Sequence, residues 1–146
     1  HPNIADGDLE LEVLESSALD NLAHVSNVIE SCHELGIGFA LDDFGTGYSS
    51  LIYLKRLPAG LIKIDQGFVR DMLEDPEDLA IIQGVLGLSN AFGRNTIAEG
   101  VETILHGERL LKLGCLLGQG YGIARPMPAS EIENWLKTWR PDASWV

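Results

Sequence analysis

Residues 37–50 read IGFALDDFGTGYSS, a short apolar run that ends in two adjacent carboxylates and continues into a loop rich in glycine and hydroxyl groups. The apolar part has the length and composition of a buried strand, with Asp42 and Asp43 at its carboxyl end. Either Ser49 or Ser50 can cap the short helix that the following leucines indicate. A strand, a polar strand end and a helix form the unit from which the remaining chain is built.

The same unit recurs along the chain. We expect strands at residues 9–15, 37–43, 61–65, 96–101 and 115–123. Strands that alternate with helices indicate an α/β fold, in which a parallel sheet covered by helices forms either a barrel or an open sheet. The nucleotide-binding glycine motifs of open sheets, GxGxxG and GxxxxGKS/T, do not follow any of these strands. We therefore expect part of a modified TIM-type (β/α) barrel, with about five strand-helix units.

Four of the expected helices begin at recognisable capping residues. Asp20 and Thr103 can each cap a helix that starts directly after them. Asp75, which is followed by a proline, opens a third helix. Ser130 and Glu133 have the spacing of a capping box for the last helix.

Length and composition indicate one globular domain over residues 1–146. The chain has 45% hydrophobic residues and a net charge of −12. So acidic a chain lacks the clustered lysines and arginines that neutralise the phosphates of a nucleic-acid duplex, so we expect no duplex binding. No apolar run reaches the roughly 20 residues that cross a bilayer. This pattern predicts a cytoplasmic segment without membrane contact, although its parent protein could be membrane-tethered.

The sequence offers few soft metal ligands. Cys32 and Cys115 lack the spacing of a metal site, and we expect reduced, partly buried thiols without a disulfide. His24, His33 and His106 fall within expected helices, where solvated positions are the simplest interpretation. Oxygen ligands remain as the candidates for binding a metal ion.

Polar side chains follow the expected strands at their carboxyl ends, which is where barrels of this type place their functional residues. They are Glu12, Glu15, Asp42, Asp43, Lys63, Asp65, Glu99, Glu102 and Gln119. Carboxylates gathered on one face repel one another unless a positive charge lies among them. Ligand sets made only of oxygen favour Mg²⁺ or Mn²⁺. Two such ions can share a carboxylate and activate a bridging water for displacement at phosphorus.

The roles of the individual residues remain open on spacing alone. Lys63 would be costly to bury unpaired, so we expect it to face the carboxylates, with a purely structural ion pair as the equal alternative. For Glu99, a strand-end salt bridge is as good an interpretation as a role in the site, whereas Glu15 and Glu102 suit supporting or loop-anchoring roles. Gln119 could equally be a turn residue without a role in the site. Asp42 and Asp43 are adjacent and can face one site only if they lie just past the strand end, because an extended strand points neighbours to opposite faces.

Five blocks of sequence resemble the EAL-domain family, bacterial phosphodiesterases that hydrolyse cyclic di-GMP to linear pGpG. They are EVLES at residues 12–16, DDFGTGYSS at 42–50, IKID at 62–65, AEGVET at 98–103, and QGYG at 119–122 running into RPMP at 125–128. Their order and spacing also match the family, and they span nearly the whole chain. The block beginning at Asp42 is the most specific of the five.

The resemblance implies roles for particular residues. The implied metal ligands, for Mg²⁺ or Mn²⁺, are Glu12, Asp42, Asp43 and Glu99, with Asp42 bridging. The implied catalytic residues are Lys63, Glu99, Glu15, Glu102 and Gln119, and the implied substrate contacts are Lys63, Gln119 and Tyr121. Lys63 resembles the lysine that contacts the attacking water and the scissile phosphate. The loop Phe44, Gly45, Thr46 and Gly47 would be anchored by Glu15.

Two departures from the family pattern qualify these expectations. Leu14 replaces the usual threonine, and we expect strand alternation to turn it away from the metals. The Glu-Ala-Leu motif and an early asparagine ligand do not occur in these residues, so the chain resembles the C-terminal part of a domain. We therefore predict weak or no hydrolysis by this chain alone, and a homodimer or element-swapped oligomer formed through open sheet edges. The alternatives are a module that binds cyclic di-GMP without hydrolysing it, or a protein-interaction module.

Overall fold

The computed structural model describes residues 4–15, 21–46 and 51–146, and its centre is a five-stranded parallel sheet. The strands are β1 (Glu10–Leu14), β2 (Gly38–Phe44), β3 (Leu61–Ile64), β4 (Asn95–Glu99) and β5 (Leu117–Gln119). Each strand pairs in parallel with the next, in the order β1-β2-β3-β4-β5. The α/β class and the five strand-helix units expected from the sequence are confirmed.

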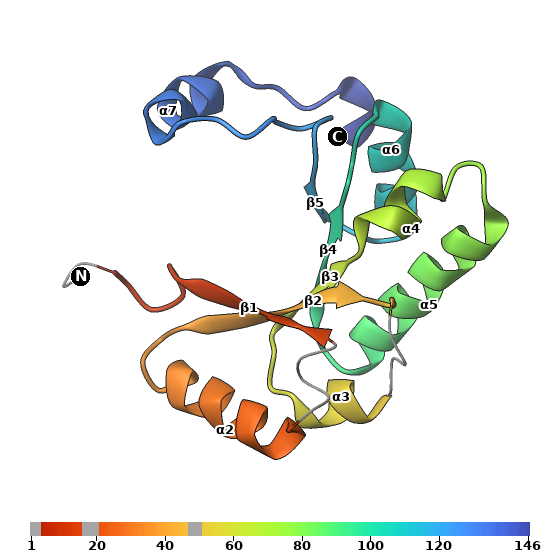
Figure 1. The fold of residues 1–146 in the computed structure, drawn as a ribbon. Coiled ribbons are helices and arrows are strands. Elements are labelled where there is room, and N and C mark those ends of the chain that lie inside the picture. Colours follow the sequence, from red (N-terminus) through yellow and green to blue (C-terminus); the bar gives the residue numbers. More distant parts are fainter. Residues whose placement is uncertain (1–3, 16–20, 47–50) are drawn as a thin grey trace.

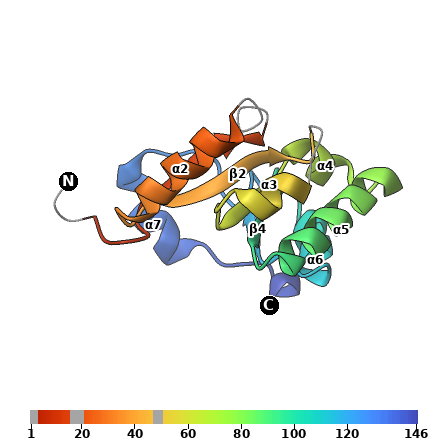
Figure 2. The same cartoon turned by 90° about the horizontal axis from the view of Figure 1, so that it is seen from below.

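Helices follow each strand and lie mainly along one side of the curved sheet (Figure 1). They are α2 (Leu22–His33), α3 (Leu51–Arg56), α4 (Gln66–Asp71), α5 (Pro76–Ala91), α6 (Ile104–Lys112), α7 (Ala129–Thr138) and the 3₁₀ helix η1 (Ala143–Trp145). In both views α2 and α7 lie at one end of the molecule, and α5 and α6 lie at the other (Figures 1 and 2). In the described residues, no helix is long and apolar enough to span a membrane.

Two of the four predicted helix starts are confirmed and one is wrong. Asp75 accepts a hydrogen bond from the backbone N–H of Glu77, and Thr103 accepts one from that of His106. Helix α7 begins one residue before Ser130, after Pro128, and has no side-chain cap. The predicted capping box fails because the proline already fixes the backbone at the helix entry.

The fourth start shifts by one residue along the chain. Asn21, rather than Asp20, caps α2 by accepting the N–H of His24. The predicted caps Asp20, Ser49 and Ser50 all lie outside the described residues.

Helix α4 was absent from our predictions. Its N-cap is Asp65, whose Oδ1 accepts the backbone N–H of Gly67 at 2.9 Å. Asp65 was expected only as a candidate site residue at the end of a strand. In the structure, one of its oxygens accepts the N-cap hydrogen bond of this helix. The helix places Arg70 close to the carboxyl end of β4, with consequences for the site.

The core lies between the sheet and helices α2 to α6. Its largest fully buried side chains include Ile29, Leu41, Phe44, Leu57, Ile62, Ile64 and Ile82. On β3, Ile62 and Ile64 face this core, so Lys63 between them points to the opposite face. The edge strands β1 and β5 are largely exposed. Both cysteines are free, with Cys115 buried and Cys32 partly buried.

Candidate functional site

A β-bulge in β2 brings two neighbouring carboxylates to the same site. Leu41 pairs with Ile62, but the next pair joins Phe44 to Ile64, so β2 contains one residue more than β3 over this interval. Asp43 adopts a left-handed conformation with φ of +54°. Strict alternation would turn Asp43 into the core with Leu41, and the bulge instead leaves Phe44 to fill the core. Asp42 and Asp43 therefore share a face inside the strand, whereas we had expected them beyond its end.

Lys63 lies at the centre of a cluster of carboxylates drawn from three neighbouring strands. Its Nζ is 2.6 Å from Glu12, 2.9 Å from Asp42 and 2.9 Å from Glu99. The lysine side chain is only 8% exposed, whereas that of Glu12 is 53% exposed. Lys63 thus supplies the positive charge that adjacent carboxylates require, and it faces them as expected.

The surroundings in the cluster raise the pKa values of Lys63 and Asp43. Burial by itself would lower the pKa of Lys63, but hydrogen bonds to Glu12, Glu99 and Asp42 outweigh burial and raise that pKa above its ordinary value. The pKa of Asp43 is raised, first by burial and then by the neighbouring charge of Asp42. The ammonium is thus stabilised in its charged form, whereas Asp43 forms no salt bridge with the residues that the structure describes.

One oxygen each from Asp42, Asp43 and Glu99 lies within 4.8 Å of the others, a spacing compatible with a shared metal ion. The Oδ1 atom of Asp42 is buried, and its close partner in the described residues is the Lys63 ammonium at 2.9 Å. Carboxylates gathered this closely repel one another, which favours a further cation among them. The all-oxygen donor set fits Mg²⁺ or Mn²⁺. Glu12 does not join this group of three and contacts Lys63 instead.

The loop after β2 is tied to the site by two hydrogen bonds. Glu15 is 2% exposed and its Oε2 accepts the backbone N–H of Gly45 at 3.1 Å. The hydroxyl of Thr46 donates to the carbonyl of Asp43 at 2.9 Å. Gly45 has φ of +104°, and a Cβ there would meet the Phe68 ring at 3.0 Å, so glycine suits this position.

Two of the four predicted loop residues need comment. Phe44 is the last residue of β2 and is 2% exposed, so it belongs to the strand and the core and not to the loop. Gly47 lies outside the described residues. The anchored part of the loop is therefore Gly45 and Thr46.

A polar pocket of about 290 Å³ adjoins the carboxylate cluster at Glu99. Its lining consists of Gln66, Arg70, Glu99, Gly100, Glu102, Gln119, Gly120 and Tyr121. Four of these residues, Glu99, Glu102, Gln119 and Tyr121, are predicted site residues. The ends of α4, β4 and β5 thus bring together side chains that are far apart in the sequence.

Two arginines at this pocket escaped the sequence analysis. Arg70 donates from Nε to Glu102 at 2.9 Å, across the pocket wall. Arg125 lies over the Tyr121 ring, 4.7 Å from its centroid, as a cation–π pair. No local sequence pattern marks Arg70, because its position depends on the unpredicted helix α4. Arg125 belongs to the RPMP block, whose resemblance was noted without a role.

Two other expectations are wrong. His106 was expected to be solvated, but it is 6% exposed because α6 packs it against the end of α4. Leu14 was expected to turn away from the metals, and hence from the face that carries Glu12 and Asp42. Val13 packs against the core, so Leu14 shares the face of Glu12, where it pairs with Asp42 and is 45% exposed.

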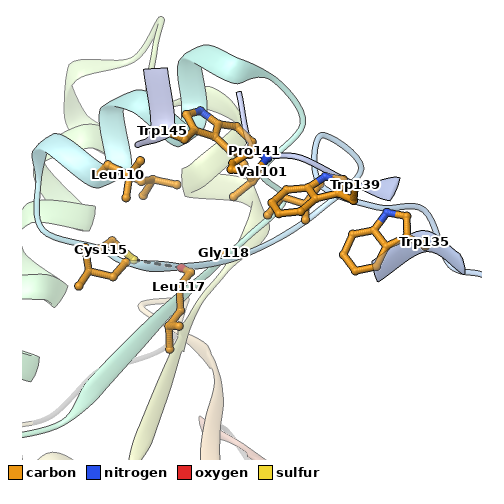
Figure 3. Close-up of a pocket in the computed structure, with 13 residues that line it drawn as sticks. Val101, Leu110, Cys115, Leu117, Gly118, Trp135, Trp139, Pro141 and Trp145 are labelled. Atoms are coloured by element: carbon orange, nitrogen blue, oxygen red, sulfur yellow. Dashed lines mark hydrogen bonds between the residues drawn. The ribbon is translucent and has the colours of Figure 1, made fainter. Parts of the chain in front are cut away.

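The larger cavity, of about 400 Å³, is lined by apolar side chains (Figure 3). Leu110, Cys115 and Leu117 line one side, and Trp135 and Trp139 lie toward the other. None of its lining residues is charged. Without groups that could act on a substrate, this cavity is a poor candidate for chemistry despite its size.

Comparisons with known proteins show which family the sequence resembles. A model of the EAL domain matches residues 1–126 of the chain. The bifunctional diguanylate cyclase/cyclic di-GMP phosphodiesterase MucR of Pseudomonas aeruginosa is 44% identical over 124 residues, which are 85% of this chain and 18% of that protein. The cyclic di-GMP phosphodiesterase PA2567 of the same bacterium is 44% identical over 129 residues, 88% of this chain and 22% of that protein.

Solved structures share the fold. A structure described as the PaMucR phosphodiesterase in a c-di-GMP complex matches with a TM-score of 0.83 and 43% identity, covering 87% of this chain and 51% of that one. The EAL domain of Mycobacterium smegmatis DcpA matches with a TM-score of 0.85 and 38% identity, covering 93% and 61%. The chain spans less than a quarter of the two curated relatives and between half and two thirds of these two solved chains.

Proposed function

The chain belongs to the EAL domain family, and from that membership we propose that it takes part in the metal-dependent hydrolysis of cyclic di-GMP to linear pGpG. The observation that carries the proposal is the cluster of Asp42, Asp43 and Glu99 around a buried lysine, directly beside a polar pocket. A phosphodiester needs positive charge at its phosphoryl oxygens, which Lys63 and a metal held by the carboxylates would provide, and polar groups for its bases, which the pocket offers.

We assign the metal to the three clustered carboxylates, with Glu12 as a fourth group that can turn from Lys63 to the ion. When bound, Mg²⁺ or Mn²⁺ would supply an activated water at neutral pH and offset the charge of the phosphate. Lys63 is held by three carboxylate partners, and when one of them turns to the metal, the freed N–H of its ammonium can orient a water or hold a phosphate oxygen.

The neighbouring residues bind and orient the nucleotide in this proposal. Gln119 and Tyr121 line the polar pocket and offer hydrogen-bonding groups and a ring for stacking. Glu102 lines the same pocket and holds Arg70 there. Glu15 acts at a distance, since its bond to Gly45 holds the loop that follows Asp43.

Calorimetry with cyclic di-GMP, followed by chromatography of the products, tests the proposal. With Mg²⁺ or Mn²⁺ present, we expect metal-dependent binding and at most slow release of pGpG, and with EDTA we expect no pGpG. The Asp43→Asn variant is the matched control, because it keeps the shape of the side chain and removes its charge. Binding that is independent of metal and gives no product would favour a binding module, and no binding under either condition would overturn the proposal.

Four further expectations stay predictions: one domain over residues 1–146, a cytoplasmic location, weak or no hydrolysis by this chain alone, and a homodimer or element-swapped oligomer. The last is supported by the sheet itself. In the described residues β1 pairs only with β2 and β5 only with β4, and Leu11 and Leu117 on these edge strands are 39% and 48% exposed. Sedimentation at micromolar concentration checks it, and a monodisperse monomer would contradict it.

A further inference from the structure

His106 is a buried polar side chain that the proposed chemistry does not use. It lies in the first turn of α6 and is 6% exposed. Its Nδ1 accepts the backbone N–H of Glu102 at 3.3 Å. Because Nδ1 is then the unprotonated nitrogen of a neutral ring, Nε2 carries the hydrogen and donates it to the carbonyl of Arg70 at 3.2 Å. These two hydrogen bonds identify the neutral tautomer with its hydrogen on Nε2.

The two residues held by this ring stand on the same wall of the polar pocket. Glu102 comes from the connection between β4 and α6, and Arg70 comes from the last turn of α4. The Arg70 carbonyl is one of the final four of its helix, which have no partner within the helix. His106 therefore fixes the backbone of both residues, while their side chains meet at 2.9 Å in the pocket wall.

The ion pair between Arg70 and Glu102 would not hold this wall by itself. The two side chains are 48% and 41% exposed, and pairs so exposed to water contribute little to order. The histidine ring is buried, and each of its nitrogens has a backbone partner on the wall. The buried ring thus holds the two backbones in place, whereas the exposed ion pair between the side chains adds little to this order.

We propose that His106 is a positioning residue, which acts through the backbones of Glu102 and Arg70 to set the shape of the pocket that receives the nucleotide. The inference rests on the proposed function for its ligand. A residue that only filled space would affect the folding of the chain as a whole. A positioning residue affects nucleotide affinity while leaving the carboxylate cluster, which shares only Glu99 with the pocket, able to bind metal.

Three substitutions separate the two bonds. In His106→Asn the amide oxygen takes the place of Nδ1 and keeps the bond to Glu102, while the bond to Arg70 is lost. In His106→Gln the amide nitrogen takes the place of Nε2 and keeps the bond to Arg70, while the bond to Glu102 is lost. His106→Leu removes both bonds and keeps an apolar side chain. His24→Leu on exposed α2 is the matched control.

The measured quantities are the Kd for cyclic di-GMP, the Kd for Mn²⁺ alone and the midpoint of thermal unfolding. We expect His106→Leu to weaken nucleotide binding about tenfold to thirtyfold, and each amide variant to weaken it about threefold to tenfold, as expected for the loss of two bonds or one. The Kd for Mn²⁺ should stay within about twofold of the unchanged chain in all of them. Unchanged nucleotide affinity, or equal losses for nucleotide and Mn²⁺, would overturn the proposal.

A second measurement covers the case in which the unchanged chain binds no cyclic di-GMP. That result would overturn the proposed function, and nitrogen NMR of the imidazole would then decide the inference. A ring protonated at Nε2, together with faster hydrogen exchange of the Glu102 amide in His106→Leu and His106→Gln but not in His106→Asn, would support the positioning role. A ring protonated at Nδ1, or exchange that is the same in all variants, would overturn it.

Discussion

Two regions of this molecule invite a functional interpretation: the carboxylate cluster with its adjoining polar pocket, and the apolar cavity. They differ in volume, in charge and in backbone strain. The cavity is the larger, at about 400 Å³, and its walls are apolar side chains in ordinary packing. The cluster combines a buried lysine, a carboxylate with a raised pKa and a left-handed Asp43. Such backbone strain persists only where the surrounding structure enforces it, and it gathers at functional sites. Strain and charge, rather than volume, therefore locate the chemistry.

Replacing Lys63 by Met should have the largest effect, because it removes the only cation that contacts Glu12, Asp42 and Glu99 in the described residues. We expect hydrolysis to fall by about 100-fold or more. In EDTA we expect the free energy of unfolding to fall by about 2–3 kcal/mol, less than for a fully buried pair because Glu12 is half exposed. Urea unfolding measures this change.

Lys112→Met is the matched control for that experiment. Lys112 is 69% exposed and pairs with Glu108 one turn away on α6, so its loss should change the free energy of unfolding by less than about 0.5 kcal/mol. Added Mg²⁺ should restore part of the stability lost in the Lys63 variant, because the ion replaces the missing charge. If the Lys63 variant is as stable as the unchanged chain in EDTA, charge does not set the cluster apart from the apolar cavity.

Replacing Asp43 by Gly should separate strain from function. Glycine adopts the left-handed backbone at no steric cost, so we expect stability to rise by about 0.5–1 kcal/mol. The affinity for Mn²⁺ should fall more than tenfold, because one of the three clustered oxygens is lost. Titration with Mn²⁺ and thermal unfolding measure the two effects. Stability that falls along with metal affinity would show that Asp43 carries no strain.

Replacing Trp145 by Ala tests the apolar side of the comparison. The indole donates to the carbonyl of Ile104 at 3.0 Å and packs so closely on Gly107 that a methyl group there would overlap it. We expect the free energy of unfolding to fall by about 1–2 kcal/mol through lost packing and one lost hydrogen bond. The affinity for Mn²⁺ should not change. Val146→Ala, at a side chain 94% exposed, is the control, and a loss of metal affinity in Trp145→Ala would contradict the separation.

The two cysteines should give the smallest effect. Burial raises the pKa of Cys115, which leaves a smaller fraction of reactive thiolate at any pH below that pKa. At pH 8 we therefore expect iodoacetamide to modify Cys32 more than tenfold faster than Cys115, as followed by mass spectrometry. In urea the two rates should converge. Equal rates in the folded chain would mean that the cavity wall at Cys115 opens readily.

The sequence predicted those features that depend on local chemistry. Asp75 and Thr103 mark their helices because a cap needs only the residues of one turn. The cost of burying an unpaired ammonium between two isoleucines predicted that Lys63 faces the carboxylates. The resemblance blocks then indicated which strand ends carry the site.

Features that depend on contacts between distant segments could not be predicted in this way. The bulge at Asp43 is a register difference between β2 and β3, which no pattern within β2 reveals. The burial of His106 follows from the position of α4, a helix of 6 residues that contains Gly67 and has too little periodicity to recognise. The start of α7 was missed because Pro128 took precedence over the local capping signal.

The bulge in β2 also limits how this site can be grafted or lost. Copying the aspartates onto a regular strand would turn one of them into the core, so a designer must transfer an added residue as well as the side chains. Conversely, deleting one of the two residues between Leu41 and Phe44 would restore a regular strand, with Leu41 and Phe44 still in the core and a single aspartate left on the site face. The site is therefore encoded by the added residue in β2 as much as by its acids.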